Sequence, residues 1–467
     1  MDDQIISSMP PQIIVFPSPL QWPSNSMFDL AELLCLSGHD VTFVLIPYTH
    51  TLLLRYFRIE SRLSPYLNFH LQTISDGLPP DHPRSDPTEL LESLETMTKP
   101  VFKEWLTSEK CGQVSCIISD GHMGFVYDVA NEIQVPVFSA LTLSPTSLWV
   151  VYNLFNLSEP GEVSDLRESD LNSLIKRVPG IKGVLTGGDL ASMCQSSDLA
   201  SPSSKVLMKQ FKELSRAHGV IFNTCKALDG SILSQIRSFC PNIYTIGPVH
   251  THLAVRQEAK SIEPLLNYSV DENKNCLAWL DTRQPKSVLY VNIENEVKLT
   301  RVQVLELWHG LVNSGKGFLW VRQPESIVGD GRVPPKIHKG TKERGCIVDS
   351  ASNVQVLAHK AIGGFLTRGQ WDSTLQGIAE GVPIICWPSS WDQQVNSKFV
   401  SKAWKVGIDM EGSLDRSIIE KTIRDVTESK GELVENATKM KYKVRKSVSK
   451  DGSSYAVLDH LVDDIKN

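Results

Sequence analysis

Short apolar runs alternate with longer amphipathic stretches along the whole chain. Runs such as Gln12 to Phe16 and Val41 to Leu45 are typical of buried strands. The stretch between them, Met27 to Ser37, has the helical period of about 3.6 residues. Strands that alternate with helices predict parallel sheets covered by helices on both faces. The pattern resumes at Ser287 to Asn292, so we expect an α/β protein with doubly wound, Rossmann-like sheets.

The length of 467 residues predicts two domains of about 200 residues each. We expect an N-terminal domain over residues 1–249 and a C-terminal domain over 276–450, joined by a linker over 250–275, which is polar and has no strong period. Residues 451–467 are predicted to form a helix that returns to the first domain. Two facing doubly wound domains place a ligand cleft at the carboxyl ends of both sheets.

Composition narrows the function without identifying it. Hydrophobic residues make up 41% of the chain, charged residues 21%, and the net charge is −6, which does not favour nucleic acid as a partner. The N-terminus lacks the apolar core of a signal peptide, and no run approaches the ~20 apolar residues of a membrane span. We therefore expect a cytoplasmic protein. The nine cysteines form no C-x-x-C pair and no metal-ligand pattern, so no metal site is predicted.

The stretch from Ser350 to Gln393 organises the second domain. Its short apolar runs predict buried parallel strands at Val356-Leu357, Ile362 to Leu366 and Val382 to Cys386. After the second run, Asp372 or Ser373 is expected to cap a helix that begins at Thr374. The free N–H groups of such a helix start form a natural anion site.

This stretch resembles the donor-binding signature of plant UDP-sugar-dependent glycosyltransferases, W-A-P-Q-x-x-V-L-x-H-x-A-x-G-x-F-x-T-H-C-G-W-N-S-x-x-E-x-x-x-x-G-V-P-x-x-x-x-P-x-x-x-D-Q. Trp371, Ser373, Asp392 and Gln393 match it, and the resemblance implies that the last two hold sugar hydroxyls. It covers nearly the whole chain and implies the two-domain B-type fold, with acceptor in the first domain and donor in the second. Phrases such as Thr73 to Pro79 resemble the branch that glucosylates small terpenoids, including iridoids.

The departures from the signature fall on positions that contact the nucleotide sugar in the family. Ser350 replaces the Trp that stacks on uracil, a loss of roughly 1–3 kcal/mol by analogy with base stacking. Gln376 replaces the Glu that binds the ribose, Asp372 replaces Asn, and Glu294 replaces a Gly beside the diphosphate, where a carboxylate is repulsive. Arg368 replaces His and could bind phosphate, or close onto Glu294 or Asp372.

The catalytic base of the family also has no counterpart. Its pattern P-x-x-x-Q-G-H-x-x-P-M corresponds to Pro17 to Met27, with Gln21 retained, Trp22 in place of Gly and Pro23 in place of the His that takes the acceptor's proton. Gln21, Trp22 and Pro23 are therefore expected to line the substrate cleft without supplying a base. A missing general base costs on the order of 10²–10⁴ in rate.

Asp120, which follows a buried strand, matches the Asp that holds this His in the family. Residues two apart in an extended segment share a face, so Asp120 and His122 could form a displaced acid/base pair. The alternative is that Asp120 caps a helix beginning near Gly121 and that His122 is a solvated first-turn residue.

Three functional hypotheses follow. The leading one is an enzyme that has given up sugar transfer, needs no cofactor, and performs cyclisation, isomerisation, elimination or carbonyl condensation on a small apolar metabolite such as an iridoid or related aldehyde. The second is a UDP-glucose-dependent glucosyltransferase of a terpenoid acceptor, working through Arg368 and the Asp392-Gln393 pair. The third is a pseudoenzyme that binds a small apolar metabolite or a partner enzyme without turnover. The sequence leaves open whether the chain pairs with another protein.

Overall fold

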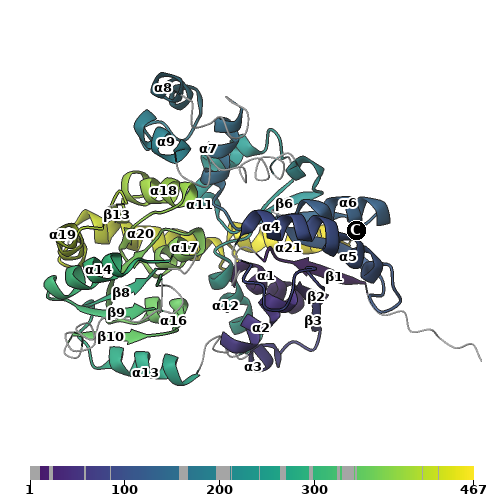
Figure 1. The fold of residues 1–467 in the computed structure, drawn as a ribbon, viewed down its shortest axis with the longest axis horizontal. Helices are drawn as coiled ribbons and strands as arrows, with labels where there is room; N and C mark the ends of the chain where they lie inside the picture. The colour runs from purple at the N-terminus through teal and green to yellow at the C-terminus, as the bar shows by residue number, and fades with distance from the viewer. Residues whose placement is uncertain are drawn as a thin grey trace, which may run out of the picture.

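Two parallel sheets, one in each half of the chain, organise the fold in the computed structural model (Figure 1). The structure describes residues 11–19, 25–56, 59–84, 86–121, 123–156, 167–195, 211, 213–240, 242–262, 270–293, 298–322, 327–328, 341, 344–412, 414–429 and 431–466. Every strand pair among these residues is parallel. The predicted α/β class with doubly wound sheets is confirmed.

The first sheet is seven-stranded, in the order β3-β2-β1-β4-β5-β6-β7. Its strands are β1 (Gln12–Phe16), β2 (Asp40–Leu45), β3 (Phe69–Thr73), β4 (Val114–Asp120), β5 (Val137–Leu141), β6 (Gly219–Phe222) and β7 (Ile243–Thr245). The described helices of this half are α1 (Asn25–Leu36), α2 (Pro47–Tyr56), α3 (Ile59–Leu63), α4 (Pro87–Ser93), α5 (Lys99–Leu106), α6 (Gly124–Ile133), α7 (Pro145–Phe155), α8 (Glu168–Arg177), α9 (Gly187–Cys194), α11 (Lys226–Ile236) and α12 (Val249–Ala259).

The second sheet is six-stranded, in the order β10-β9-β8-β11-β12-β13. Its strands are β8 (Val288–Asn292), β9 (Gly317–Val321), β10 (Gly345–Val348), β11 (Ile362–Thr367), β12 (Ile384–Cys386) and β13 (Gly407–Asp409). The described helices are α13 (Val270–Asp281), α14 (Arg301–Asn313), α16 (Asn353–Ala358), α17 (Trp371–Glu380), α18 (Trp391–Lys398), α19 (Arg416–Thr427), α20 (Glu432–Ser447) and α21 (Ser453–Lys466). The direction of winding reverses between β1 and β4 and between β8 and β11, so each half has a topological switch point.

Alternating side chains bury both faces of the first sheet. Ile13 and Val15 belong to the core cluster on the side of α1, α12 and α21, while Ile14 and Phe16 belong to the cluster on the side of α5 and α6. This is the pattern expected when successive residues of a strand point to opposite faces. The last helix, α21, is drawn in yellow over the first sheet and packs against β7 (Figure 1).

Two local predictions differ from the structure. Val356-Leu357 is part of helix α16 rather than a strand, because Ser352 caps that helix by accepting a hydrogen bond from Gln355 N–H. Helix α17 begins at Trp371 rather than Thr374, so Asp372 and Ser373 lie in its first turn and are not its cap.

The predicted linker over 250–275 is also more ordered than its weak period indicates. Its first part lies in helix α12, which buries Leu253 and packs against α1. Residues 263–269 lie outside the described residues, and α13 begins at Val270. The domain boundaries themselves stay a prediction. Within the described residues, no helix is long and apolar enough to cross a membrane.

Candidate active site

Asp120 lies at the carboxyl end of β4, next to the switch point of the first sheet, and is fully buried. Ile118 belongs to the core cluster on the α1 side, and Asp120, two residues further along the strand, shares that face. The carboxyl group therefore lies on the side of the sheet where α1 begins. Helix α6 begins only at Gly124 with Met123 as its cap residue, so the alternative that Asp120 caps a helix near Gly121 is not what the structure shows.

Several predicted site residues lie outside the described residues. They are Gln21, Trp22, Pro23, His122 and Glu294. The displaced acid/base pair of Asp120 with His122, and the repulsion between Glu294 and a diphosphate, therefore stay predictions. The same holds for the closing of Arg368 onto Glu294.

Asn223, just after β6, joins the two domains at the start of α17. Its backbone carbonyl accepts a hydrogen bond of 2.8 Å from Trp371 Nε1, and its Nδ2 donates to Asp372 Oδ1 at 2.9 Å. Its Oδ1 accepts from the backbone N–H of Val249 at 2.9 Å. The sequence reasoning missed Asn223. The signal available was its position at the carboxyl edge of the first sheet, where the cleft was expected.

Asp372 is turned from the first turn of α17 towards the N-terminal domain. Its carboxylate accepts hydrogen bonds from the hydroxyl and the backbone N–H of Ser26 in α1, as well as from Asn223. Burial, with a smaller contribution from the nearby carboxylate of Asp29, raises the pKa of Asp372 to about 6, while the hydrogen bonds oppose the shift. The described partners of Asp372 thus lie across the domain boundary.

Arg368 follows β11 and is 2% exposed. Its guanidinium carbon lies 4.4 Å from the centroid of the Trp387 ring, a cation–π contact that orients the side chain. The next residue, Gly369, has φ of 91°, which is a left-handed conformation that favours glycine. A buried guanidinium beside the start of α17 is a suitable phosphate ligand. The other altered donor positions are the half-buried Ser350 and the buried Gln376.

Asp392 and Gln393 lie in the first turn of helix α18. The side-chain carbonyl of Gln393 accepts hydrogen bonds from the backbone N–H groups of Ser389 at 2.9 Å and Ser390 at 3.3 Å, and the Ser390 hydroxyl bonds Asp392. These contacts fix the loop after β12 against the helix. The geometry holds both side chains that match the sugar-binding positions of the signature in one short turn.

Helix α18 is also bonded to the N-terminal domain. Asn396 Oδ1 accepts from the hydroxyls of Ser144 at 2.8 Å and Ser147 at 3.2 Å, both at the start of α7. Lys398 Nζ lies 3.2 Å from Asp189 Oδ1 on α9 and 2.9 Å from Asp409 Oδ2 at the end of β13. These contacts hold the donor-side helix α18 against α7 and α9.

Asp229 is a second carboxyl group near this boundary that the sequence reasoning did not identify. It is 1% exposed and accepts hydrogen bonds from Thr146 Oγ1 at 2.8 Å and Thr224 Oγ1 at 2.6 Å. Burial raises its pKa from 3.8 to about 6. Because the folded protein binds this proton more tightly than the unfolded chain, the linked stability is fully present below about pH 4 and is lost as the pH rises through about 6.

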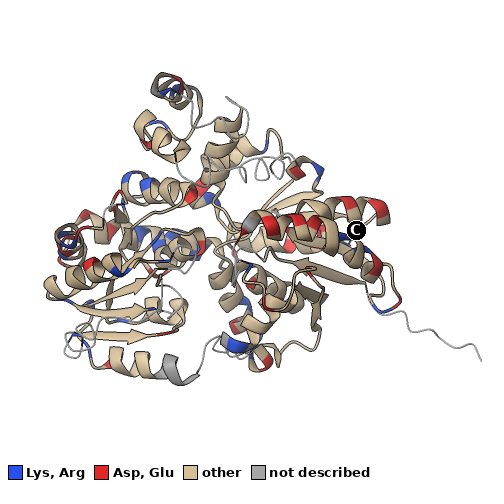
Figure 2. Cartoon of the chain, viewed as in Figure 1, with Lys and Arg blue, Asp and Glu red and all other residues tan. Residues whose placement is uncertain are grey.

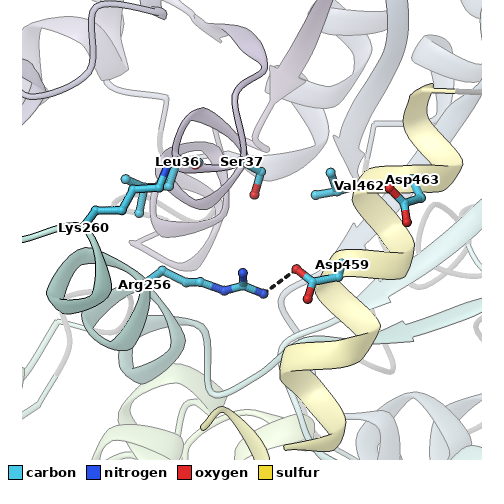
Figure 3. A pocket seen from close by; sticks show the side chains of 7 residues that line it. All are labelled: Leu36, Ser37, Arg256, Lys260, Asp459, Val462 and Asp463. Carbon is cyan, nitrogen blue, oxygen red and sulfur yellow. Dashed lines mark hydrogen bonds and ion pairs between the residues drawn. The ribbon is translucent and has the colours of Figure 1, made fainter. Parts of the chain in front are cut away.

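A cavity of about 270 Å³ lies between the end of α1, α12 and α21, and none of the predicted site residues lines it (Figure 3). It is lined by Leu36, Ser37, Arg256, Lys260, Asp459, Val462 and Asp463. Arg256 bonds Asp459 across it at 2.6 Å, and Lys260 Nζ bonds the carbonyl of Leu36. Both cations already have partners in the protein, so we do not assign this cavity to the reaction.

The described part of the chain contains no cluster of three or more His, Cys, Asp or Glu side chains arranged to hold a metal ion. Acidic and basic residues occur in both halves of the chain (Figure 2). The described residues at the two switch points supply carboxyl groups, a buried guanidinium and the amide groups at a helix start.

Comparisons with known proteins show which proteins this chain is similar to. A family model described as UDP-glucoronosyl and UDP-glucosyl transferase matches residues 296–440. The chain is 41% identical to a 7-deoxyloganetic acid glucosyl transferase of Catharanthus roseus over 475 residues, covering 99% of this chain and 98% of that protein. It is 31% identical to a 7-deoxyloganetin glucosyltransferase of the same plant over 477 residues, covering 98% and 97%. The crystal structure of Os79 from O. sativa in complex with UDP aligns with a TM-score of 0.81 and 26% identity, covering 97% of this chain and 100% of that one.

These relatives contradict the leading hypothesis of an enzyme that has given up sugar transfer. Proteins this similar over the full length are named glucosyltransferases. The hypothesis counted each altered residue as a lost contact. The position of Asp372 shows the weakness of that reasoning, because its carboxylate is hydrogen-bonded to the N-terminal domain. The second hypothesis, a UDP-glucose-dependent transferase, is the better supported one.

Proposed function

This chain belongs to the plant family of UDP-dependent glycosyltransferases and has their B-type fold, and we propose that it transfers glucose from UDP-glucose to a small terpenoid acceptor of the iridoid class. The observation that carries the proposal is the 41% identity, over 99% of this chain, to a 7-deoxyloganetic acid glucosyl transferase. UDP-glucose is a substrate in this reaction. No further cofactor is part of the proposal.

We assign donor binding to the start of α17 and the residues around it. The start of α17 can bind the diphosphate, because the first backbone N–H groups of a helix point outward and the helix dipole favours an anion there. Arg368, held over the Trp387 ring, supplies a positive charge for the phosphates. Asp392 and Gln393, at the start of α18, are assigned to the glucose hydroxyls. These assignments explain how donor binding survives the loss of the family's His.

Another group has to accept the proton of the acceptor hydroxyl, since the sequence has Pro23 where the family has its catalytic base. We assign it to Asp120, which is buried at the carboxyl end of β4 on the face towards α1. The acceptor oxygen attacks C1 of glucose while the bond from C1 to the UDP oxygen breaks. The acceptor's proton passes to Asp120, and UDP leaves with the bonding electron pair. Arg368 and the N–H groups of α17 stabilise the charge that develops on UDP.

The test is product formation with the acceptors named in the two relatives. The purified chain with UDP-glucose should form a glucoside of 7-deoxyloganetic acid or of 7-deoxyloganetin, together with UDP, and Asp120→Asn should lower kcat by about 10²–10⁴-fold. UDP binding by calorimetry should be the same in Asp120→Asn as in the unchanged chain. Binding of UDP with no glucoside from either acceptor would contradict the iridoid assignment. Unchanged kcat in Asp120→Asn would remove it as the base.

We place the reaction in the cytoplasm, as predicted from the sequence. All nine cysteines are free thiols, as is usual for proteins of reducing compartments. Burial raises the pKa of several of them, including Cys116 and Cys225, which makes them unreactive as thiolates.

A further inference from the structure

We propose that Asp372 is an interdomain latch: its carboxylate caps the N-terminus of α1 in the other domain and so holds the start of α17 in position for the donor. In this role Asp372 is a positioning residue that contacts the N-terminal domain rather than the diphosphate. The effect on the donor rests on the proposed function, whereas the contact between the domains does not.

The first argument is that two departures from the family patterns contact each other. Asp372 stands where the donor signature has Asn, and Ser26 stands where the acceptor-side pattern has Pro. Proline has neither a backbone N–H nor a hydroxyl. Ser26 has both, and both donate to the Asp372 carboxylate. The pair of residues found in this chain therefore makes a contact that the residues of the family patterns cannot make.

The second argument is the position of the contact on α1. Helix α1 begins at Asn25, so the N–H of Ser26 is among the first N–H groups of the helix, which have no acceptor within it. A side-chain oxygen at these groups is what a normal helix cap supplies, and a negative charge there is favoured by the helix dipole. In this protein the carboxylate comes from the first turn of a helix in the other domain.

The third argument is that the contact is reinforced by a neighbouring residue. Asn223 donates from Nδ2 to Asp372 at 2.9 Å and accepts from Trp371 Nε1 at 2.8 Å. Two consecutive residues of α17 are thus bonded to the N-terminal domain. Movement of the domains relative to each other has to break both contacts.

A second carboxylate lies near the contact. Asp29, one turn further along α1, raises the pKa of Asp372 by repulsion, although Arg62 bonds Asp29 at 2.6 Å and also bonds Glu32. The hydrogen bonds from Ser26 and Asn223 therefore hold the Asp372 carboxylate against a nearby like charge. With its carboxylate engaged by these donors, Asp372 leaves the N–H groups of α17 to the diphosphate.

The test is a double-mutant cycle between Asp372→Ala and Ser26→Pro in the full chain. Both variants should lower the urea midpoint, and the double variant should lose no more than the larger single loss, because one contact is lost in all three. Asp425→Asn, an exposed carboxylate on α19, is the control and should change nothing. If Ser26→Pro does not fold, Ser26→Ala replaces it, since it removes the hydroxyl donor alone. Additive losses would overturn the latch.

UDP binding provides the second readout. Asp372→Ala and Ser26→Pro should each raise the Kd for UDP about tenfold, with no further rise in the double variant, and Asp372→Asn should fall between because its Oδ1 can still accept. In turnover the loss should appear in KM for UDP-glucose more than in kcat. If the unchanged chain does not bind UDP, the proposed function fails, while the unfolding cycle still decides the latch. An unchanged Kd in both single variants would overturn the positioning role.

Discussion

Lys398 is predicted to be the strongest single contact between α18 and the N-terminal domain. Its side chain is 10% exposed, and its Nζ lies between Asp189 of α9 at 3.2 Å and Asp409 at 2.9 Å. Lys398→Met would leave these two carboxylates, with side chains 14% and 7% exposed, without this cation. Breaking a buried ion pair by removing one partner costs about 3–5 kcal/mol.

Lys402 is a matched control, because it is the same residue type one turn away and approaches the same Asp189. Its side chain is 40% exposed and its Nζ lies 3.5 Å from Asp189. Lys402→Met should therefore cost no more than about 1 kcal/mol. Urea unfolding of both variants, followed by tryptophan fluorescence, measures the difference in unfolding free energy. A loss in Lys398→Met within about 0.5 kcal/mol of that in Lys402→Met would refute the account of a buried clamp.

Three further predictions concern the cleft. Asp229 should add up to about 3 kcal/mol to the unfolding free energy as the pH falls from about 7 to 4. Urea unfolding of Asp229→Asn at both pH values should lack this gain. The same pH dependence in the variant and the unchanged chain would contradict the prediction. Arg368→Gln should weaken UDP binding by about 10–100-fold in calorimetry and leave uridine binding unchanged, because only UDP carries phosphates. Equal losses of affinity for both ligands would contradict a phosphate role of Arg368. Trp371→Phe should cost about 1–2 kcal/mol in urea unfolding by leaving the Asn223 carbonyl without this donor; no loss would contradict the contact.

The two doubly wound sheets could be predicted because their signal is local. Strands such as β1 and β2 are short apolar runs, and the helix between them has its own period. The strand predicted at Val356-Leu357 was wrong for the same reason, since an apolar run of this length fits a helix as well as a strand. The cap at Ser352 decides between them, and it depends on a hydrogen bond to Gln355 that the apolar pattern does not contain.

The contacts between the two domains could not be predicted from local sequence patterns. Asn223 and Trp371 are 148 residues apart in the chain, and no local pattern relates them. Asp372 differs from the Asn of the donor signature, and its carboxylate is hydrogen-bonded to Ser26, which belongs to the other pattern. Judging each altered residue separately led to the wrong expectation that sugar transfer had been lost. Contacts between distant segments decide what a substitution does.

The central claim is tested most directly by following labelled glucose. The purified chain is incubated with UDP-glucose carrying ¹³C in the sugar and with 7-deoxyloganetic acid, and the products are separated and weighed by mass spectrometry. We expect the label in a glucoside of the acceptor, with one UDP formed for each glucoside. Conversion of the acceptor to a product without label, or release of the label only as free glucose, would contradict glucosyl transfer by this chain.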